Sequence, residues 1–319
     1  MIPFVHHFEF DYAQVKSVSP LIRRIVARNP GPFTFTGTGT YLIGRDEPGA
    51  EIFVIDPGPE LGEHLDAILA ATAGQRLTRI FVTHAHMDHS PLARPLAERT
   101  GAVIHAGPEP CQPSNGGIRL EAGDDLSFAP DVPLRDGDLF SADGWTLEAL
   151  ATPGHTANHY GYVLQDEQAL FPGDCVMGWS TTIISPPDGD MGAYMATLAR
   201  IRARDFAVMW PTHGPPVTQT GPFMDAYIAH RRQREAQIVT ALQERGEATI
   251  RCLVPELYAA VETRLYPAAS HSMLAHLIDL VRRGVVNCEG APAIGSVYRT
   301  VALEDLTGEV EARRSAAWS

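Results

Sequence analysis

Short apolar runs alternate with helical repeats over the first hundred residues. The runs at 51–55 and 80–82 are rich in β-branched and aromatic residues and end at polar or turn residues, so they predict buried strands. Between them, apolar positions recur at helical spacing over residues 61–69 and predict an amphipathic helix that packs on the sheet. A second helix is predicted at 91–99 and a further strand at 102–106. We expect one large α/β domain.

The middle of the chain carries a different pattern. Residues 134–171 show short strands separated by Asp-Gly turns, which fits a half-barrel sheet. A helix at 190–202 and a strand at 207–210 follow. Residues 109–133 show neither pattern and predict a long loop, and loops of that length often form a lid or a wall of a substrate site.

The composition changes after a cluster of Pro and Gly at 215–222, which marks a domain boundary. Three helices are predicted beyond it, followed by two strands at 285–288 and 296–300. Three helices and a hairpin are a winged-helix arrangement. We therefore expect a catalytic domain of residues 1–222, a winged-helix-like domain of residues 223–302 and a C-terminal tail of residues 303–319.

The strongest chemical signal directly follows the strand at 80–82. Residues 83–89 read Thr-His-Ala-His-Met-Asp-His, and imidazole nitrogens and carboxylate oxygens are ligands that zinc accepts. The side chains of His84 and His86, two residues apart, are expected to point to the same side, whereas those of Asp88 and His89 project further along the turn. Four such ligands on one short loop do not comfortably face a single tetrahedral ion. The spacing predicts two neighbouring ions.

This H-x-H-x-D-H loop resembles the hallmark of the metallo-β-lactamase superfamily, and three further motifs match in the family's order. They are Thr-Pro-Gly-His-Thr at 152–156, a strand-end Gly-Asp at 173–174 and a His-Gly at 213–214. The resemblance implies a four-layer αββα sandwich. It also implies two metal ions, held by His84, His86 and His155, by Asp88, His89 and His213, and by a bridging Asp174.

The same resemblance implies the chemistry. The expected enzyme is a hydrolase whose nucleophile is a hydroxide bridging two divalent ions, and Asp88 orients that hydroxide and relays its proton to the leaving group. We expect zinc at both positions. Manganese and iron remain alternatives, because these ligands accept each of the three metals.

Residues around the ligands also match the family, with three departures, one of which is Ser90-Pro91-Leu92 after the metal loop, where the family usually has a small residue and glycines. On the family pattern Asp56 orients a metal-bound histidine. The segment after Asp174, which contains Trp179, is expected to form one wall of the pocket. For His159 we consider both a role at the site and plain hydrogen bonding within the sheet. Gly39 stands where the family commonly has Asn, and Thr212 stands where it most often has Gly.

Composition narrows the location and the partners. The net charge of −13 repels phosphate backbones and weighs against non-specific nucleic-acid binding. The four cysteines are far apart and indicate neither a disulfide framework nor a cysteine zinc site. The chain lacks a run of about 20 apolar residues, and its start does not resemble a secretory signal. We expect a cytoplasmic protein with no membrane partner.

The C-terminal region adds a second resemblance. Its order is similar to the winged-helix-like module of β-lactamase-like proteins of the LACTB2 type, including an Ala-His-Leu run that ends at Leu277. Nucleic acid is therefore kept as a partner, but it is not favoured because the third helix offers only Arg282 and Arg283 as cations. We expect a packing or pocket-completing role, with the arginines of 231–234 on a solvated helix face.

Three functions are weighed. The first is hydrolysis of an ester, thioester or lactone in a small-molecule substrate, similar to the glyoxalase II and lactonase branches. The second is a single-stranded RNA endonuclease of the LACTB2 type. The third is an iron-containing redox member of the fold, against which the absence of a flavin-domain extension counts. A homodimer is left open.

Overall fold

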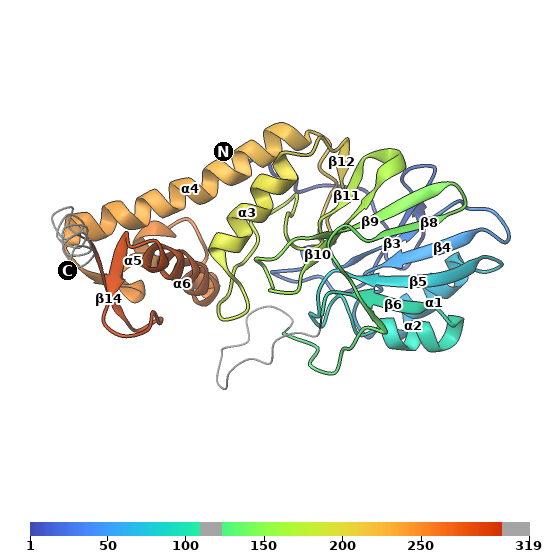
Figure 1. Ribbon diagram of the computed structural model, residues 1–319, viewed down its shortest axis with the longest axis horizontal. Coiled ribbons are helices and arrows are strands. Elements are labelled where there is room, and N and C mark those ends of the chain that lie inside the picture. The colour runs from blue at the N-terminus through green and yellow to red at the C-terminus, as the bar shows by residue number, and fades with distance from the viewer. Residues whose placement is uncertain (109–122, 302–319) are drawn as a thin grey trace, which may run out of the picture. The chain divides into compact units, whose positions relative to one another are not determined.

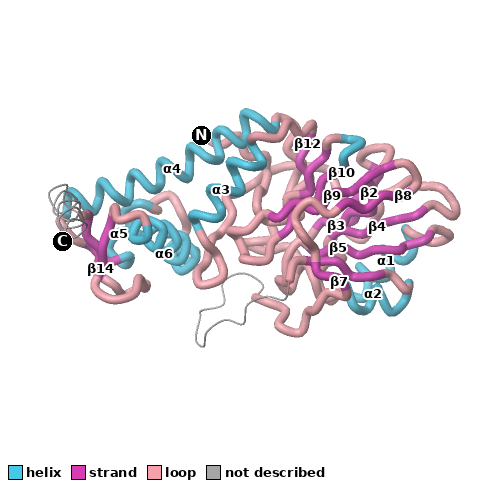
Figure 2. The backbone as a smooth tube through the Cα atoms, viewed as in Figure 1, coloured by secondary structure: helices cyan, strands magenta, loops and turns pink. Residues whose placement is uncertain are grey.

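The computed structural model describes residues 1–108 and 123–301 (Figure 1). The tail expected at 303–319 and most of the loop expected at 109–133 lie outside these residues. Figure 2 shows how helices and strands follow one another along the backbone. The helices are α1 (Gly62–Ala71), α2 (Ala93–Thr100), α3 (Met191–Arg202), α4 (Thr220–Arg245), α5 (Ile250–Leu257) and α6 (Tyr266–Arg282), with short 3-10 helices at Gln165–Glu167 and Thr263–Leu265.

Two mixed sheets form the larger part of the described structure, with strand orders β1-β2-β3-β4-β5-β6-β7 and β12-β11-β10-β9-β8. The first sheet contains β1 (Lys16–Ser17), β2 (Ile22–Val26), β3 (Gly39–Ile43), β4 (Glu51–Ile55), β5 (Arg76–Val82), β6 (Val103–Ala106) and β7 (Val132–Pro133). The second contains β8 (Leu139–Ala142), β9 (Trp145–Ala151), β10 (Tyr160–Leu164), β11 (Ala169–Phe171) and β12 (Val208–Met209).

The two sheets pack face to face around an aromatic core. Phe53 of β4 contacts Trp145 of β9 with ring centroids 4.7 Å apart, and Phe81 of β5 contacts Tyr162 of β10 at 5.2 Å. The Tyr162 hydroxyl donates to the backbone oxygen of Val82, 2.7 Å away. Side chains that alternate along each strand thus join the two sheets and leave the strand ends free to carry loops.

Helices cover the outer faces. Leu65 and Ile68 of α1 and Leu96 of α2 pack with the opposite side chains of β2 to β6 in a second apolar cluster. On the other side, Thr197 of α3 donates to the backbone oxygen of Pro153, and Arg200 donates to that of Ala151. These layers confirm the expected αββα sandwich and the α/β class.

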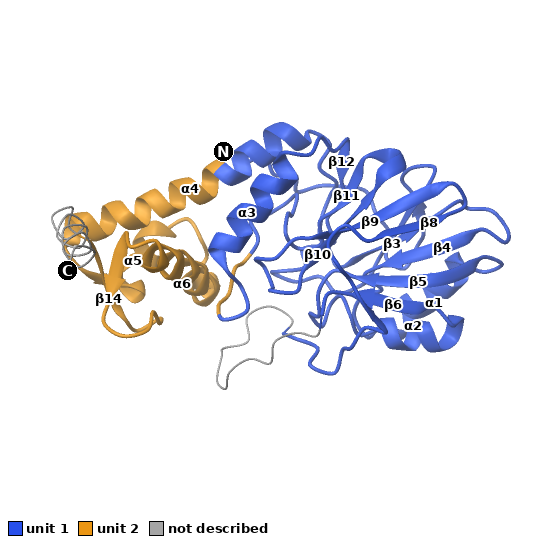
Figure 3. Ribbon diagram, viewed as in Figure 1, with its two compact units in different colours: residues 1–182, 187–228 blue, residues 183–186, 229–319 orange. Residues whose placement is uncertain are grey.

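The chain divides into two compact units, residues 1–182 with 187–228 and residues 183–186 with 229–319 (Figure 3). The boundary that we expected between residues 222 and 223 falls inside α4, which is one continuous helix. The second unit has its own apolar core, formed by α4, α5, α6 and three strands. Its sheet has the order β13-β15-β14, with β13 at Ala248–Thr249, β14 at Val286–Cys288 and β15 at Val297–Thr300.

The expected hairpin is β14 paired with β15, whereas the sequence pattern missed β13. The expectation that the arginines of 231–234 lie on a solvated face was wrong in part. Arg231 is only 4% exposed, and the Arg234 guanidinium lies 4.1 Å from the Tyr258 ring centroid. A run of arginines marks a helix, but neighbouring elements decide which of them reach solvent. In the part of the chain that the structure describes, no helix combines the length and apolar character needed to cross a membrane.

Candidate metal centre

The candidate ligands all lie in loops that begin where strands end. His84, His86, Asp88 and His89 follow β5, and three loops from the second sheet supply the others. His155 lies between β9 and β10, Asp174 follows β11 and His213 follows β12. The two facing sheets therefore bring together residues up to 129 positions apart in sequence, and all seven belong to one compact unit.

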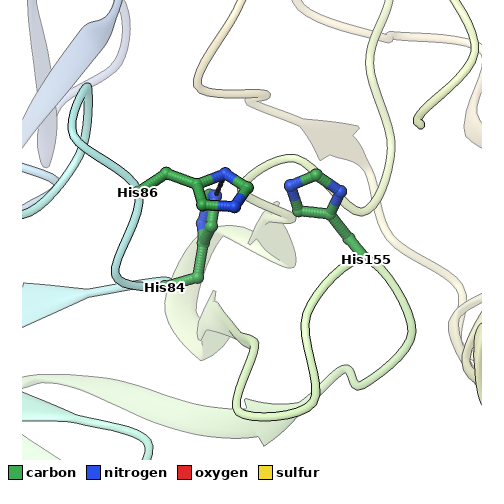
Figure 4. Close-up of side chains that lie close together, drawn as sticks. All are labelled: His84, His86 and His155. Carbon is green, nitrogen blue, oxygen red and sulfur yellow. Dashed lines mark hydrogen bonds between the residues drawn. The ribbon is translucent and has the colours of Figure 1, made fainter. Parts of the chain in front are cut away.

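His84, His86 and His155 form one group, whose ligand atoms lie within 4.8 Å of one another (Figure 4). The His84 Nε2 and His86 Nδ1 atoms are 2.9 Å apart, and His155 faces them from its own loop. Burial and neighbouring imidazoles lower the pKa of His84 well below its usual range, and burial, with His155 beside it, lowers the pKa of His86 to about 3. Neutral imidazoles with a free lone pair are the form that binds a metal ion.

A second group combines carboxylates with histidines. Asp88, His89 and His213 meet within 4.8 Å, and so do His84, His89 and Asp174. The His213 Nε2 atom lies 3.1 Å from Asp88 Oδ2 and 3.4 Å from Asp174 Oδ2, and His89 Nε2 lies 3.6 Å from Asp174 Oδ2. Asp174 therefore lies next to both groups, which is where a ligand shared by two ions would have to be.

Electrostatics within this group are strong. Burial opposes charge on His213, but Asp174 and Asp88 outweigh it and raise its pKa to about 10. Burial likewise opposes ionisation of Asp88, but His89 and His213 lower its pKa to about 2. Two imidazolium charges thus balance the carboxylates here. A divalent ion bound by the same atoms would supply the same positive charge.

The hydrogen bonding of the ligand atoms also indicates that a metal ion fits this site. His89 Nε2, His213 Nε2 and Asp174 Oδ1 are buried and make no hydrogen bond within the described residues. Buried polar atoms normally have hydrogen-bond partners, whereas these two nitrogens have only ion-pair contacts of 3.1–3.7 Å with Asp88 and Asp174. Convergent orphan nitrogen and oxygen atoms are the donor set that zinc, manganese and iron accept. The residues present fit a metal site.

Asp56 supports the second ligand group through hydrogen bonds. It directly follows β4, is fully buried, and accepts His89 Nδ1–H at 2.8 Å through Oδ2, so the Nε2 atom of His89 points into the site. The same oxygen accepts the hydroxyls of Thr83 at 2.8 Å and Thr212 at 2.9 Å. Sequence reasoning named Asp56 but overlooked both threonines. Thr212, which appeared only as a departure from the family's glycine, joins the His213 loop to this network.

His159 is bonded on both ring nitrogens. Its Nδ1 lies 2.7 Å from the Thr152 hydroxyl, and its Nε2 accepts the backbone N–H of Asp174 at 3.3 Å. A Cβ atom on Gly173 would lie 2.7 Å from His159 Nε2, so glycine permits this approach. Of the two roles weighed for His159, the geometry favours one at the site, because the ring holds the backbone of a candidate ligand.

A segment that sequence reasoning treated only as loop also contacts the ligands. The Asp124 carboxylate lies 3.4 Å from His86 Nε2, on the side of the ring away from His84. Backbone hydrogen bonds join Met87 to Gly123 and Asp125 to Ala85, so this segment pairs with the metal loop. The signal in the sequence was the acidic pair 124–125 at the end of the predicted loop.

Trp179 lies beside the ligands rather than among them. Its ring stacks on Phe35, with centroids 4.8 Å apart and planes at 17°, and it fits against Gly214, where a Cβ would lie 2.6 Å from the indole. Phe35 holds a positive φ of 54°, a conformation uncommon for a bulky residue. The aromatic pair thus packs against the turn that carries His213.

Comparisons with known proteins agree with this geometry. Residues 34–213 match the Metallo-beta-lactamase superfamily, and residues 249–294 match the Beta-lactamase associated winged helix domain. The chain is 32% identical over 288 residues to Beta-lactamase-like protein 2 homolog of Caenorhabditis elegans. These residues cover 89% of this chain and 91% of that protein.

Two further similarities are informative. The chain is 32% identical over 241 residues to Atrochrysone carboxyl ACP thioesterase of Aspergillus fumigatus, covering 73% of this chain and 68% of that protein. Its fold is similar to that of a beta-lactamase domain protein from Burkholderia ambifaria, with a TM-score of 0.75 and 19% identity over 94% of this chain and 97% of that one. The resemblance found in the sequence motifs is confirmed. This chain belongs to the metallo-β-lactamase superfamily, as a hydrolase that carries the associated winged helix domain.

Proposed function

We propose that the protein is a dinuclear metal-dependent hydrolase of thioesters, with esters and lactones as related substrates. The observation that carries the proposal is the joined set of seven ligands, six buried and His86 half-buried, in which Asp174 lies next to both groups. The thioesterase relatives favour a carbonyl carbon bonded to sulfur as the point of attack.

His84, His86 and His155 would hold one ion and Asp88, His89 and His213 the other, with Asp174 shared. When bound, two divalent ions lower the pKa of a coordinated water toward about 7 and polarise the carbonyl oxygen under attack. Zinc suits these nitrogen and oxygen donors, and manganese or iron would fit the same set.

Asp88 is the residue that we assign to proton handling. Its pKa of about 2 keeps the carboxylate ionised at neutral pH, so it can accept a hydrogen bond from an attacking water and orient it. Passing that proton on matters most when the leaving group is an alkoxide. A thiol has an ordinary pKa of about 8.5 and leaves readily as its anion, so a thioester needs this relay less than an ester does.

The surrounding residues position the ligands and the substrate and do not take part in the reaction themselves. Asp56 orients His89, and His159 holds the backbone of Asp174. Trp179 and Phe35 present an aromatic surface beside the His213 turn, which suits an apolar acyl group of a small-molecule substrate. A net charge of −13 weighs against a polyanionic substrate.

The test is turnover by protein of measured metal content. Substrates are an S-acyl thioester, the matching oxygen ester, an acyl-homoserine lactone, bis-p-nitrophenyl phosphate and a single-stranded RNA oligomer. We expect the thioester to be cleaved fastest. Asp88→Asn should lower kcat on the ester more than on the thioester, because an alkoxide leaving group depends on the relay more than a thiolate does.

The exposed His7→Ala serves as the matched histidine control and should leave turnover and metal content unchanged. Cleavage of RNA alone would refute the carbonyl substrate and favour the endonuclease alternative. Retention of full thioester turnover after chelation would refute the metal-dependent mechanism. Bound iron with redox turnover and no hydrolysis would favour the redox alternative.

A further inference from the structure

A cavity of about 280 Å³ lies against the turn that carries His213, but none of the candidate ligands lines it. Trp210 and Pro216 flank that turn in the sequence and form one wall, and the N-terminal segment forms the other. The wall is mainly apolar and aromatic, formed by Phe8, Phe10, Val18, Val26, Trp210 and Pro216. The polar lining residues Glu9, Asp11, Gln14 and Lys16 are exposed, so Arg24 is the one buried charged residue of the lining.

Arg24 lines this cavity as a buried cation with few partners. The residue is only 5% exposed, and within the described residues its side chain makes one hydrogen bond, from Nη2 to the Gly214 backbone oxygen at 2.9 Å. The rings of Phe8 and Tyr41 lie 4.9 and 5.5 Å from the guanidinium carbon. Its Nε is buried without a hydrogen bond, and no carboxylate of the described residues forms an ion pair with it.

The preceding residue shows how this fold treats a buried arginine elsewhere. Arg23 is 3% exposed and donates to Asp46 Oδ1, to the Ala71 backbone oxygen and to Gln75 Oε1, each within 2.9 Å. A buried charge is stable only when it is paired and hydrogen-bonded, and contacts with aromatic rings offset only part of the lost hydration. The Nε atoms of both arginines make no hydrogen bond within the described residues, so the difference lies in the terminal nitrogens. Those of Arg23 bind Asp46, Ala71 and Gln75, whereas Arg24 has no carboxylate partner among the described residues.

The space around Arg24 also has a specific origin. A Cβ atom on Gly39 would lie 2.6 Å from Arg24 Nε and 2.7 Å from Nη2, so the guanidinium occupies the volume next to a missing side chain. Trp210, which also lines the cavity, has a buried Nε1 that makes no hydrogen bond within the described residues.

We propose that this cavity binds an organic carboxylate, with the carboxylate on Arg24 and an apolar or aromatic body between Phe8, Phe10 and Trp210. A guanidinium offers a planar pair of donors that matches a carboxylate, and an aromatic wall favours a flat apolar body. None of the candidate metal ligands lines this cavity. The cavity is linked to the metal centre by the hydrogen bond from Arg24 to Gly214, which directly follows His213 in the sequence.

The test measures binding of 1-naphthoate to the metal-loaded full chain by isothermal titration calorimetry, with 1-naphthalenemethanol as the neutral control of the same shape. Naphthoate should bind at least tenfold more tightly than the alcohol. Arg24→Gln should weaken naphthoate binding at least tenfold, and Arg24→Lys, which keeps the charge, should weaken it less. Equal affinity for the acid and the alcohol would overturn the proposal.

Because Arg24→Gln could destabilise the fold, a second variant leaves the arginine in place. Val18→Trp fills the cavity from its half-buried wall and should abolish naphthoate binding while leaving hydrolytic turnover unchanged. Naphthoate binding that survives Val18→Trp and competes with substrate would place the carboxylate on the metal ions. That result would overturn the proposal without touching the proposed hydrolase activity.

Discussion

At the scale of single residues, Asp56 shows how one buried carboxylate can organise a metal centre. Its two oxygens accept the backbone N–H and hydroxyl of Thr83, the Nδ1–H of His89 and the hydroxyl of Thr212. These donors come from the ends of strands in both sheets. The carboxylate therefore couples the orientation of His89 to the position of the His213 loop.

Replacing Asp56 with Asn should weaken metal binding. An amide has one acceptor oxygen where the carboxylate has two, so His89 Nδ1–H loses a charged acceptor and its ring is held less firmly. We expect affinity for the ion held by His89 to fall roughly 10–100-fold. Competition with a chromophoric chelator measures this. The exposed Asp66→Asn on α1 is the control, and equal affinities in the two variants would contradict the role of Asp56.

Thr212→Val should lower stability. Valine keeps the shape of threonine but removes the hydroxyl that donates to Asp56, and it leaves a buried carboxylate oxygen with one donor fewer. We expect the free energy of unfolding to fall by about 1–3 kcal/mol. Urea denaturation measures it. Thr218→Val, at an exposed position, should change stability by no more than about 0.5 kcal/mol, and a similar loss in both variants would argue against the hydrogen bond.

At the scale of elements, arginines fix α3 and the residues just after it to the second sheet. Arg204 makes a bidentate pair with Glu148 of β9, with N···O distances of 2.6 and 2.9 Å. Tyr194 of α3 donates its hydroxyl to the backbone oxygen of Cys175, the residue after Asp174. The anchoring of α3 therefore bears on the position of the candidate bridging ligand.

The Glu148 pair predicts a pH dependence of stability. Hydrogen bonds from Arg204 lower the pKa of Glu148 below its ordinary 4.5. The pair therefore stabilises the fold fully above pH 4.5, and this contribution disappears as the pH falls through the lowered pKa. We expect Glu148→Gln to lose about 1 kcal/mol at pH 7, and this loss should shrink progressively as the pH is lowered below 4.5. Urea unfolding of both proteins across this range measures it, and a difference that stays constant with pH would refute it.

At the scale of the whole molecule, the chain has two compact units with separate cores. The sandwich core centres on residues such as Trp145 and Phe81, and the second unit packs around Leu277 and Tyr298. All seven candidate ligands belong to the first unit. Binding of metal should therefore act on the two units unequally.

Metal removal should loosen only the sandwich loops. Chelation removes the ions that cross-link the four ligand-bearing loops, so binding energy is lost from the folded state. We expect faster amide hydrogen exchange over residues 84–89 and 152–159, and unchanged exchange in α5 and α6. Mass spectrometry of peptides before and after chelation measures it. Uniform change in both units would refute this prediction.

Local sequence determined the element types and the α/β class, and the resemblance of its motifs to a known family supplied the αββα sandwich and the full set of candidate ligands. His84, His86, Asp88 and His89 are close because six residues of one turn hold them, and apolar runs place that turn at a strand end. Periodicity and spacing act over a few residues and need no knowledge of the rest of the chain. The continuous helix α4 and the strand β13 were missed, since Pro222 read as a break and two residues carry no period.

Only the tertiary structure decided which side chains support the ligands. Asp124 beside His86, Thr212 on Asp56, and Arg24 in the space left by Gly39 each depend on strand register and on loops that meet across the fold. Residues 156 positions apart, such as Asp56 and Thr212, become neighbours only when two sheets pack face to face. The burial of Arg231 in α4 likewise depends on neighbouring elements that are distant in the sequence. Hydrogen bonds and burial depend on three-dimensional proximity, whereas sequence patterns report only the local conformation of the backbone.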